Sequence, residues 1–129
     1  MNKQFLVAGS IFGIFGVIIG AFATHGLGPL LEEASLKSFE TGVKYQIYHA
    51  LLLLIIGGFN IPGLKKLRSV FYLLVTGILF FSGSIYLLAT NDLTSIDFRS
   101  IALITPLGGS LLIIAWLILG IKFISLKNE

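Results

Sequence analysis

Four apolar stretches, each about twenty residues long, account for most of the chain. They cover residues 5–23, 43–61, 70–90 and 101–121. About twenty apolar residues in a helix cross the roughly 30 Å of hydrocarbon in a bilayer, and a helix pairs its own backbone groups where no water is available. The sequence therefore predicts an all-α integral membrane four-helix bundle, formed by a single transmembrane domain over residues 1–129.

Composition supports lipid as the main solvent, because 56% of the residues are hydrophobic and 12% are charged, against roughly 25% charged in soluble domains. The chain has no cysteine, which excludes disulfides, thiolate metal sites and a cysteine nucleophile. Its net charge of +3 is not gathered into one patch, so nucleic acid is not an expected partner. The first apolar stretch resembles a signal peptide, but it is long enough to span and is expected to be a retained first helix.

Basic residues predict the orientation of the helices. Six flank the ends expected on one side of the bilayer: Lys3, Lys65, Lys66, Arg68, Lys122 and Lys127. Three fall on the other side: Lys37, Lys44 and Arg99. Because basic residues are in excess on the cytoplasmic side of membrane proteins, both termini are expected in the cytoplasm.

The first connection, on the outer side, is expected to contain a short amphipathic helix. Pro29 suits a first helical position, and Glu32 and Glu33 suit an opening turn. Apolar residues then recur at helical spacing at positions 36, 39, 43 and 47. This helix runs into, or nearly into, the second span, and the sequence leaves open whether Gly42 interrupts it.

The second span has an unusually short apolar part. Residues 50–59 cover only about 15 Å as a helix, so Tyr45, Gln46 and His49 must also enter the hydrocarbon. Spacings of three and four place these side chains and Gly42 on one helix face. Unpaired polar groups cost about several kcal/mol in an apolar medium, so this face is expected to point into the bundle.

Other polar residues are expected at the same depth, and together they predict a polar chamber in the outer half of the bundle with His49 at its floor. The candidate residues are His25, Tyr45, Gln46, His49, Ser82, Ser84, Tyr86 and Thr105. Pro106 should add the unpaired carbonyl of Ala102. The polar side chains serve either as hydrogen bonds between helices or as a site for a ligand, ion or proton. Two histidines without cysteine leave a metal short of ligands, so neither a metal nor a cofactor is expected.

Small residues predict close helix packing. Gly9, Gly13, Gly16 and Gly20 recur along the first helix as two GxxxG pairs, which allow backbones to approach closely. Further small positions lie at Gly77, Gly83, Gly108 and Gly109. The first strip serves packing within one chain or, alternatively, a homo-oligomer interface. Trp116 is interpreted as an interfacial anchor near the cytoplasmic end.

Four stretches resemble, in order and spacing, the YgdD family of small four-helix membrane proteins, also called domain of unknown function 423, which includes transmembrane protein 256 of animals. They are GAFATHGL (20–27), FETGVKYQIYHALLLL (39–54), LFFSGSIYLLA (79–89) and ITPLGG (104–109). The family more usually has Gly and Ala at the positions of Ala23 and Thr24. The resemblance implies a multi-pass protein of the bacterial inner membrane or an organelle, without an assigned activity, and it contains the same candidate polar residues.

The functional expectation is a non-enzymatic structural or interaction role in the membrane, with lipid or another membrane protein as partner. No phosphate loop, nucleophile elbow or zinc-type histidine motif occurs in the sequence. The alternative is a small carrier or channel-like protein that binds an unidentified solute or a proton around His49.

Overall fold

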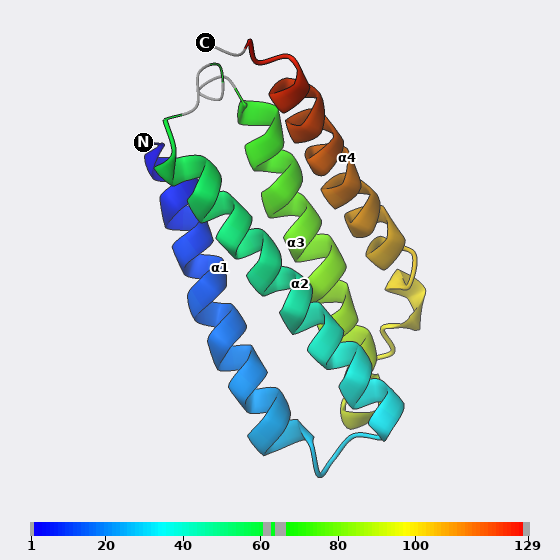
Figure 1. Cartoon of the computed structure of the whole chain (residues 1–129). Helices are drawn as coiled ribbons and strands as arrows, with labels where there is room; N and C mark the ends of the chain where they lie inside the picture. The colour runs from blue at the N-terminus through cyan, green and yellow to red at the C-terminus, as the bar shows by residue number, and fades with distance from the viewer. Residues whose placement is uncertain (1, 61–62, 64–66, 128–129) are drawn as a thin grey trace.

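The computed structural model describes residues 2–60, 63 and 67–127, and within them the chain consists of helices joined by short connections (Figure 1). The elements are α1 (Lys3–Phe22), the π-helical turn η1 (Ala23–Leu27), α2 (Glu33–Gly58), α3 (Arg68–Ala89), the 3₁₀ turns η3 (Asn91–Leu93) and η4 (Arg99–Ile101), and α4 (Ile104–Ile124). An all-α bundle is confirmed. Residues 61–62 of the expected second break, and Lys65 and Lys66 of the orientation argument, lie outside the described residues.

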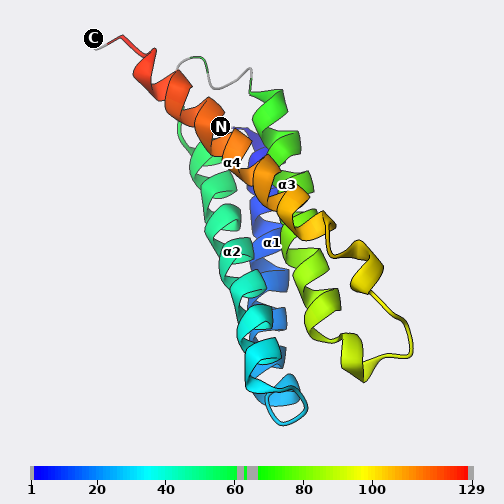
Figure 2. The same ribbon diagram turned by 90° about the vertical axis from the view of Figure 1, so that its right-hand side faces the viewer.

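Each helix packs against its neighbour in sequence: α1 on α2, α2 on α3 and α3 on α4. Figure 2 shows α4 crossing obliquely over one side of α2 and α3, while α1 lies on their other side. The hairpin of α1 and α2 extends beyond the start of α4 at the end where η1 lies. This arrangement brings side chains of α2 within reach of all three other helices.

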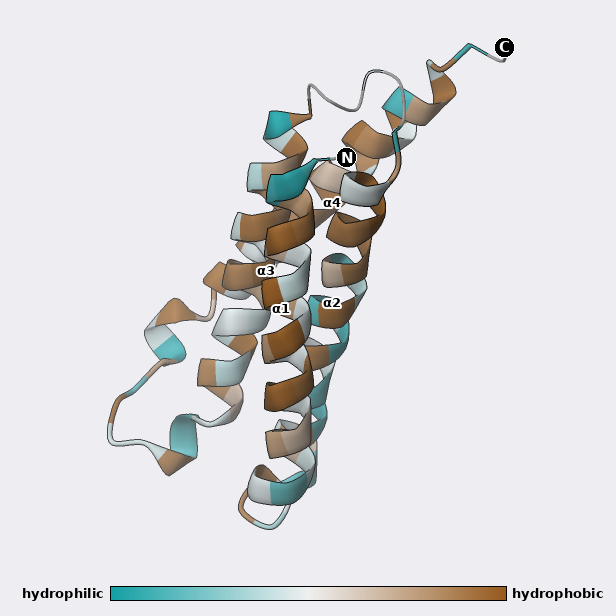
Figure 3. Ribbon diagram, turned by 90° about the vertical axis from the view of Figure 1, so that its left-hand side faces the viewer, coloured by the Kyte–Doolittle hydropathy of each residue, from teal (hydrophilic) through white to brown (hydrophobic). Residues whose placement is uncertain are grey.

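Three helical segments are long and apolar enough to cross a membrane: Lys3–Leu27, Arg68–Ala89 and Arg99–Ile124. The helix α2, which contains the expected second span, is not among them, and Figure 3 shows hydrophilic residues along the half of α2 nearest η1. Nevertheless α2 lies beside α1 over the whole length of that helix. At one end the Asn2 amide donates to the Gly57 carbonyl over 2.8 Å, and at the other Phe39 packs with Ala23 and Leu27.

The expected amphipathic helix is the first part of α2. It begins at Glu33 rather than at Pro29, which lies in the preceding turn. From Glu33 the helix continues through Gly42 to Gly58 without a break. Gly42 therefore does not interrupt the helix. One helix of 26 residues contains both the amphipathic segment and residues of the expected second span.

The fourth helix begins later than the sequence suggests. Residues 99–101 form the turn η4, and α4 starts at Ile104. Pro106 thus lies in the first turn, where a backbone amide has no helical partner in any case. Pro106 therefore interrupts no hydrogen bond in the interior of α4, because Ala102 precedes the helix.

Two apolar clusters form the core. The larger one gathers Phe5, Leu53, Leu74, Leu112 and their neighbours near the helix ends at which the N-terminus lies. The smaller one joins Ala23, Leu27, Phe39 and Ala89 near η1. Together the clusters hold the two ends of the bundle, and the polar residues of α2 lie between them.

The glycines allow the closest helix contacts. A Cβ atom on Gly9 would lie 2.9 Å from the Ala50 carbonyl oxygen, and one on Gly16 would lie 2.5 Å from Ile47. Gly20 faces α2 as well, whereas a Cβ on Gly13 would meet no atom within 4 Å. Three of the four expected packing glycines therefore contact α2 of the same chain. An interface between copies through this face stays a prediction.

Contacts between α3 and α4 are closer still. A Cβ on Gly108 would lie 2.3 Å from the backbone nitrogen of Phe81, and one on Gly77 would lie 2.7 Å from Leu112. Gly109 is in ordinary contact with the Phe81 ring, and Gly83 has open space beside it. The small residues of α4 thus bring its backbone against α3, which fixes where the two helices cross.

Candidate functional site: a polar network between the four helices

Gln46 joins three helices through its side-chain amide. From α2, its Nε2 donates to the Phe12 carbonyl of α1 over 2.8 Å, and its Oε1 accepts from the Tyr86 hydroxyl of α3 over 2.7 Å. The side chain is buried, with 4% of its surface exposed. A helical residue at this position can reach both neighbours because α1 and α3 pack against α2 from different sides.

The partner on α1 gives the depth of Gln46. Phe12 is the tenth of the twenty residues of α1, so Gln46 lies level with the centre of an apolar spanning helix. His49 follows one turn later along α2 and is buried, with 5% of its surface exposed. Both polar side chains are therefore inside the bundle at the depth of the hydrocarbon.

Two serines of α3 make further hydrogen bonds, one to α2 and one to α4. The Ser82 hydroxyl donates to the Gly42 carbonyl of α2 over 2.7 Å. The Ser84 hydroxyl pairs with the Thr105 hydroxyl of α4. Gly42 is suited to this crossing, because a Cβ atom there would lie 2.8 Å from the Tyr86 ring.

His49 makes a hydrogen bond with each of its ring nitrogens. Nδ1 lies 2.6 Å from the Tyr45 carbonyl of its own helix, and Nε2 accepts from the Trp116 indole of α4 over 3.1 Å. A carbonyl can only accept and an indole N–H can only donate. The contacts are therefore satisfied together only by the neutral imidazole with its proton on Nδ1. A proton added at Nε2 would face the indole N–H.

Trp116 belongs to this site, although the sequence indicated an interfacial anchor. Its indole donates to His49 across the bundle while 52% of its surface stays exposed on the outside of α4. Seven side chains, which we call the interhelical network, are thus bonded across the helices: Gln46, His49, Ser82, Ser84, Tyr86, Thr105 and Trp116.

Two candidate residues are placed differently. Tyr45 contributes its backbone carbonyl to His49, and its ring lies 5.2 Å from that of Phe81, measured between centroids. Its side chain is partly exposed and makes no hydrogen bond within the described residues. His25 lies in η1, is exposed, and makes no hydrogen bond to the interhelical network.

The residues of the interhelical network are paired by hydrogen bonds, and three of them also line hollows. Among the described residues, no buried side-chain nitrogen or oxygen lacks a hydrogen-bond partner. No group of three or more His, Asp or Glu residues is placed to hold a metal in that part of the chain. Two hollows border the network: a groove of about 450 Å³ between α1 and α3 with Gln46 and Tyr86 in its lining, and a crevice of about 520 Å³ beside Thr105.

Known proteins are similar to this sequence over nearly its whole length. The family described as "Protein of unknown function (DUF423)" matches residues 19–109. A UPF0382 membrane protein of Staphylococcus saprophyticus is 43% identical over 117 residues, which are 91% of this chain and 93% of the relative. YwdK, a UPF0382 membrane protein of Bacillus subtilis, is 34% identical over 119 residues, covering 91% of this chain and 93% of its own.

A third relative carries a more specific location in its name. The UPF0382 inner membrane protein YgdD of Escherichia coli is 31% identical over 134 aligned positions, covering 100% of this chain and 96% of its own. No solved structure matches. The matched residues include all of α2 and α3 and the start of α4, where six of the seven network residues lie. The chain therefore belongs to the DUF423 family and is an integral membrane protein.

Proposed function

We propose that this protein is a non-enzymatic helical module of the cell membrane that acts by associating with lipid or with another membrane protein. One observation carries the proposal: the buried polar side chains of the described residues are all paired with one another or with the backbone. A catalytic base needs a free lone pair beside its substrate, and both nitrogens of His49 are already engaged. The interhelical network therefore holds helices together.

The proposal includes four crossings with both termini in the cytoplasm. Since α2 lies beside the spanning α1 from end to end, it crosses the bilayer with it, although its own sequence is less apolar. The interhelical network offsets the cost of placing polar side chains in the hydrocarbon, because the polar face of α2 is hydrogen-bonded inside the bundle. Orientation rests on the basic residues near the N-terminus, the second connection and the C-terminus.

The surface turned away from the bundle supports association within the membrane. Large apolar side chains are exposed along α1 and α4, with fractions of 56–67% at Val17, Ile18, Phe22, Ile113 and Leu117. In water such a surface would be unfavourable, and in a bilayer it meets acyl chains or another helix.

The second candidate is a small carrier of a solute or proton. The groove between α1 and α3 supports it, because Gln46 and Tyr86 lie in its lining and each keeps hydrogen-bonding capacity beyond its one or two bonds. The remaining lining is apolar: Ile11, Phe12, Phe15, Ile19, Ile78, Leu79 and Gly83. A groove open to lipid and without a charged side chain gives weaker support than the fully paired network does.

Replacement of His49 separates the two candidates. His49→Ala should lower the melting temperature in detergent, because the Trp116 indole loses its acceptor. It should not change proton or solute flux in liposomes, which we expect to be absent in the original protein too. Tyr48→Ala, at an exposed position of the same helix, is the matched control. Flux that requires His49 would refute the proposal in favour of the carrier.

A further inference from the structure

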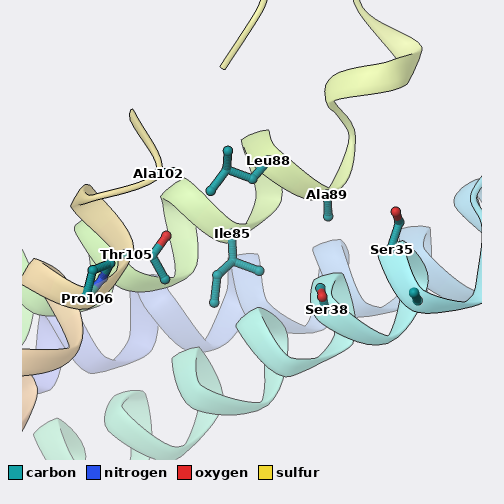
Figure 4. Close-up of a pocket in the computed structure, with 9 residues that line it drawn as sticks. Ser35, Ser38, Ile85, Leu88, Ala89, Ala102, Thr105 and Pro106 are labelled. Carbon is teal, nitrogen blue, oxygen red and sulfur yellow. The ribbon is translucent and has the colours of Figure 1, made fainter. Parts of the chain in front are cut away.

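The crevice beside Thr105 lies where three helices meet at the end of the bundle nearest η1 (Figure 4). The first turns of α2 form one wall, the last turns of α3 form the floor, and the start of α4 closes the third side. Its volume is about 520 Å³. Because α4 starts short of the hairpin of α1 and α2 (Figure 1), the crevice stays open to its surroundings.

Hydroxyl groups and apolar side chains line the crevice together. Ser35 and Ser38 lie on the α2 wall, and their hydroxyls make no hydrogen bond within the described part of the chain. Ile85 and Leu88 of α3 and Pro106 of α4 supply apolar surface. No Asp, Glu, Lys, Arg or His is in the lining, so a charged ligand would find no counter-ion here.

The depth of the two serines matches the boundary of the hydrocarbon. Gln46 lies level with the middle of α1. Ser38 and Ser35 precede it by 8 and 11 residues on the same continuous helix, which is about 12 Å and 16 Å at 1.5 Å per residue. Half of a hydrocarbon core is about 15 Å. The free hydroxyls therefore bracket the level at which acyl chains join the glycerol of a phospholipid.

We infer that this crevice binds the glycerol-ester region of a membrane phospholipid, with Ser35 and Ser38 donating to ester carbonyls and the first carbons of an acyl chain lying against Ile85, Leu88 and Pro106. At about 30 Å³ for each water-sized group, the crevice has room for roughly seventeen such groups. Ester carbonyls are hydrogen-bond acceptors, and each of the two free serine hydroxyls has a hydrogen to donate.

A water-soluble polar solute fits the crevice less well. Such a solute carries several donors and acceptors, and each one left unpaired against Ile85 or Leu88 opposes binding. A lipid brings only its carbonyls to the serines and leaves its head group in water. The inference rests on the proposed association with lipid, and it selects one class of lipid contact.

The test compares two phospholipids that differ only at this linkage. Purified protein is titrated with a diester and a diether phosphatidylethanolamine of equal chain length, and bound lipid is counted by native mass spectrometry. We expect the diester lipid to bind about tenfold more tightly, since each carbonyl hydrogen bond adds a severalfold factor. Diester phosphatidylglycerol should bind as well as diester phosphatidylethanolamine, because the lining is uncharged.

Variants tie the preference to the crevice. The double change Ser35→Ala and Ser38→Ala should abolish the preference for the ester linkage, and Ala102→Leu should reduce binding by filling the space. The matched control, Ser69→Ala with Ser125→Ala, changes two exposed serines at the opposite end of the helices. Circular dichroism verifies that each variant is folded.

Three results would overturn the inference. They are equal binding of ester and ether lipids by the original protein, an unchanged preference in the double variant, and retention of a water-soluble molecule in place of lipid. None of them bears on flux through liposomes, which tests the proposed function separately. Failure of one proposal is therefore distinguishable from failure of the other.

Discussion

The hydrogen bond between Gln46 and Tyr86 offers the most direct measurement of the interhelical network. Gln46→Met keeps the length of the side chain but removes both of its interhelical bonds, to Phe12 and to Tyr86. Tyr86→Phe removes only the bond between the two side chains. The double variant loses the same bonds as Gln46→Met and leaves no unpaired hydroxyl.

The magnitude follows from what each change leaves behind. An interhelical hydrogen bond in a membrane protein contributes about 0.6 kcal/mol on average and at most about 1.7, and a buried polar group without a partner adds about 1–3 kcal/mol. We expect Gln46→Met, which leaves the Tyr86 hydroxyl unpaired, to destabilise by about 2–3 kcal/mol, and Tyr86→Phe, which leaves the Gln46 Oε1 atom unpaired, by about 2 kcal/mol. The double variant leaves neither group unpaired, so it should be less destabilised than the sum of the two, with a coupling of about 1–3 kcal/mol.

Unfolding equilibria in bicelles or mixed micelles are measured for the original protein, the two single variants and the double variant. They give the three free-energy differences that this double-mutant cycle needs. Tyr72→Phe, at an exposed position of α3, controls for the loss of a tyrosine hydroxyl outside the network. Strict additivity of the two changes would mean that the side chains do not interact across α2 and α3. The conclusion that the interhelical network holds the helices together would then be wrong.

The remaining predictions concern the contact of α3 with α4, the indole donor and the last connection. Gly108→Ala should destabilise by about 2 kcal/mol, because its Cβ would lie 2.3 Å from the α3 backbone. The control Gly120→Ala, with open space beside it, should be neutral or stabilising in thermal unfolding. Equal effects of the two changes would contradict the packing of α4 on α3. Trp116→Phe keeps an aromatic ring but removes the hydrogen bond to the buried imidazole, and should cost about 1 kcal/mol in the same assay; an unchanged midpoint would remove Trp116 from the network. Arg99, bonded to the Asp97 carboxylate, lowers the pKa of Asp97 to about 2. The contact between the two side chains should therefore be intact above about pH 4 and be lost as pH falls through about 2. An NMR titration in which Arg99→Gln leaves the pKa of Asp97 unchanged would refute the pairing as the cause of the low pKa.

Much of the fold and part of the site follow from the sequence, because both depend on the length of each apolar stretch. The expected second span has too few apolar residues, which predicts that Gln46 and His49 lie inside the bundle, and the structure buries both. Ser82 and Ser84 could be placed for the same reason, as polar residues within an apolar stretch.

The partners of these side chains could not be predicted. Trp116 lies 67 residues from His49, and only the oblique crossing of α4 brings them together. His25 shows the opposite limit, since it follows an apolar stretch but lies in a π-helical turn that leaves it exposed. The start of α2 at Glu33 could not be predicted either, because no side chain caps that end.

The continuity of α2 has a mechanical consequence. A helix of 26 residues is about 39 Å long, longer than the roughly 30 Å of hydrocarbon in a bilayer, and it has no break along its length. We therefore expect a force on the charged first turns of α2 to be transmitted along the helix to Gln46 and His49.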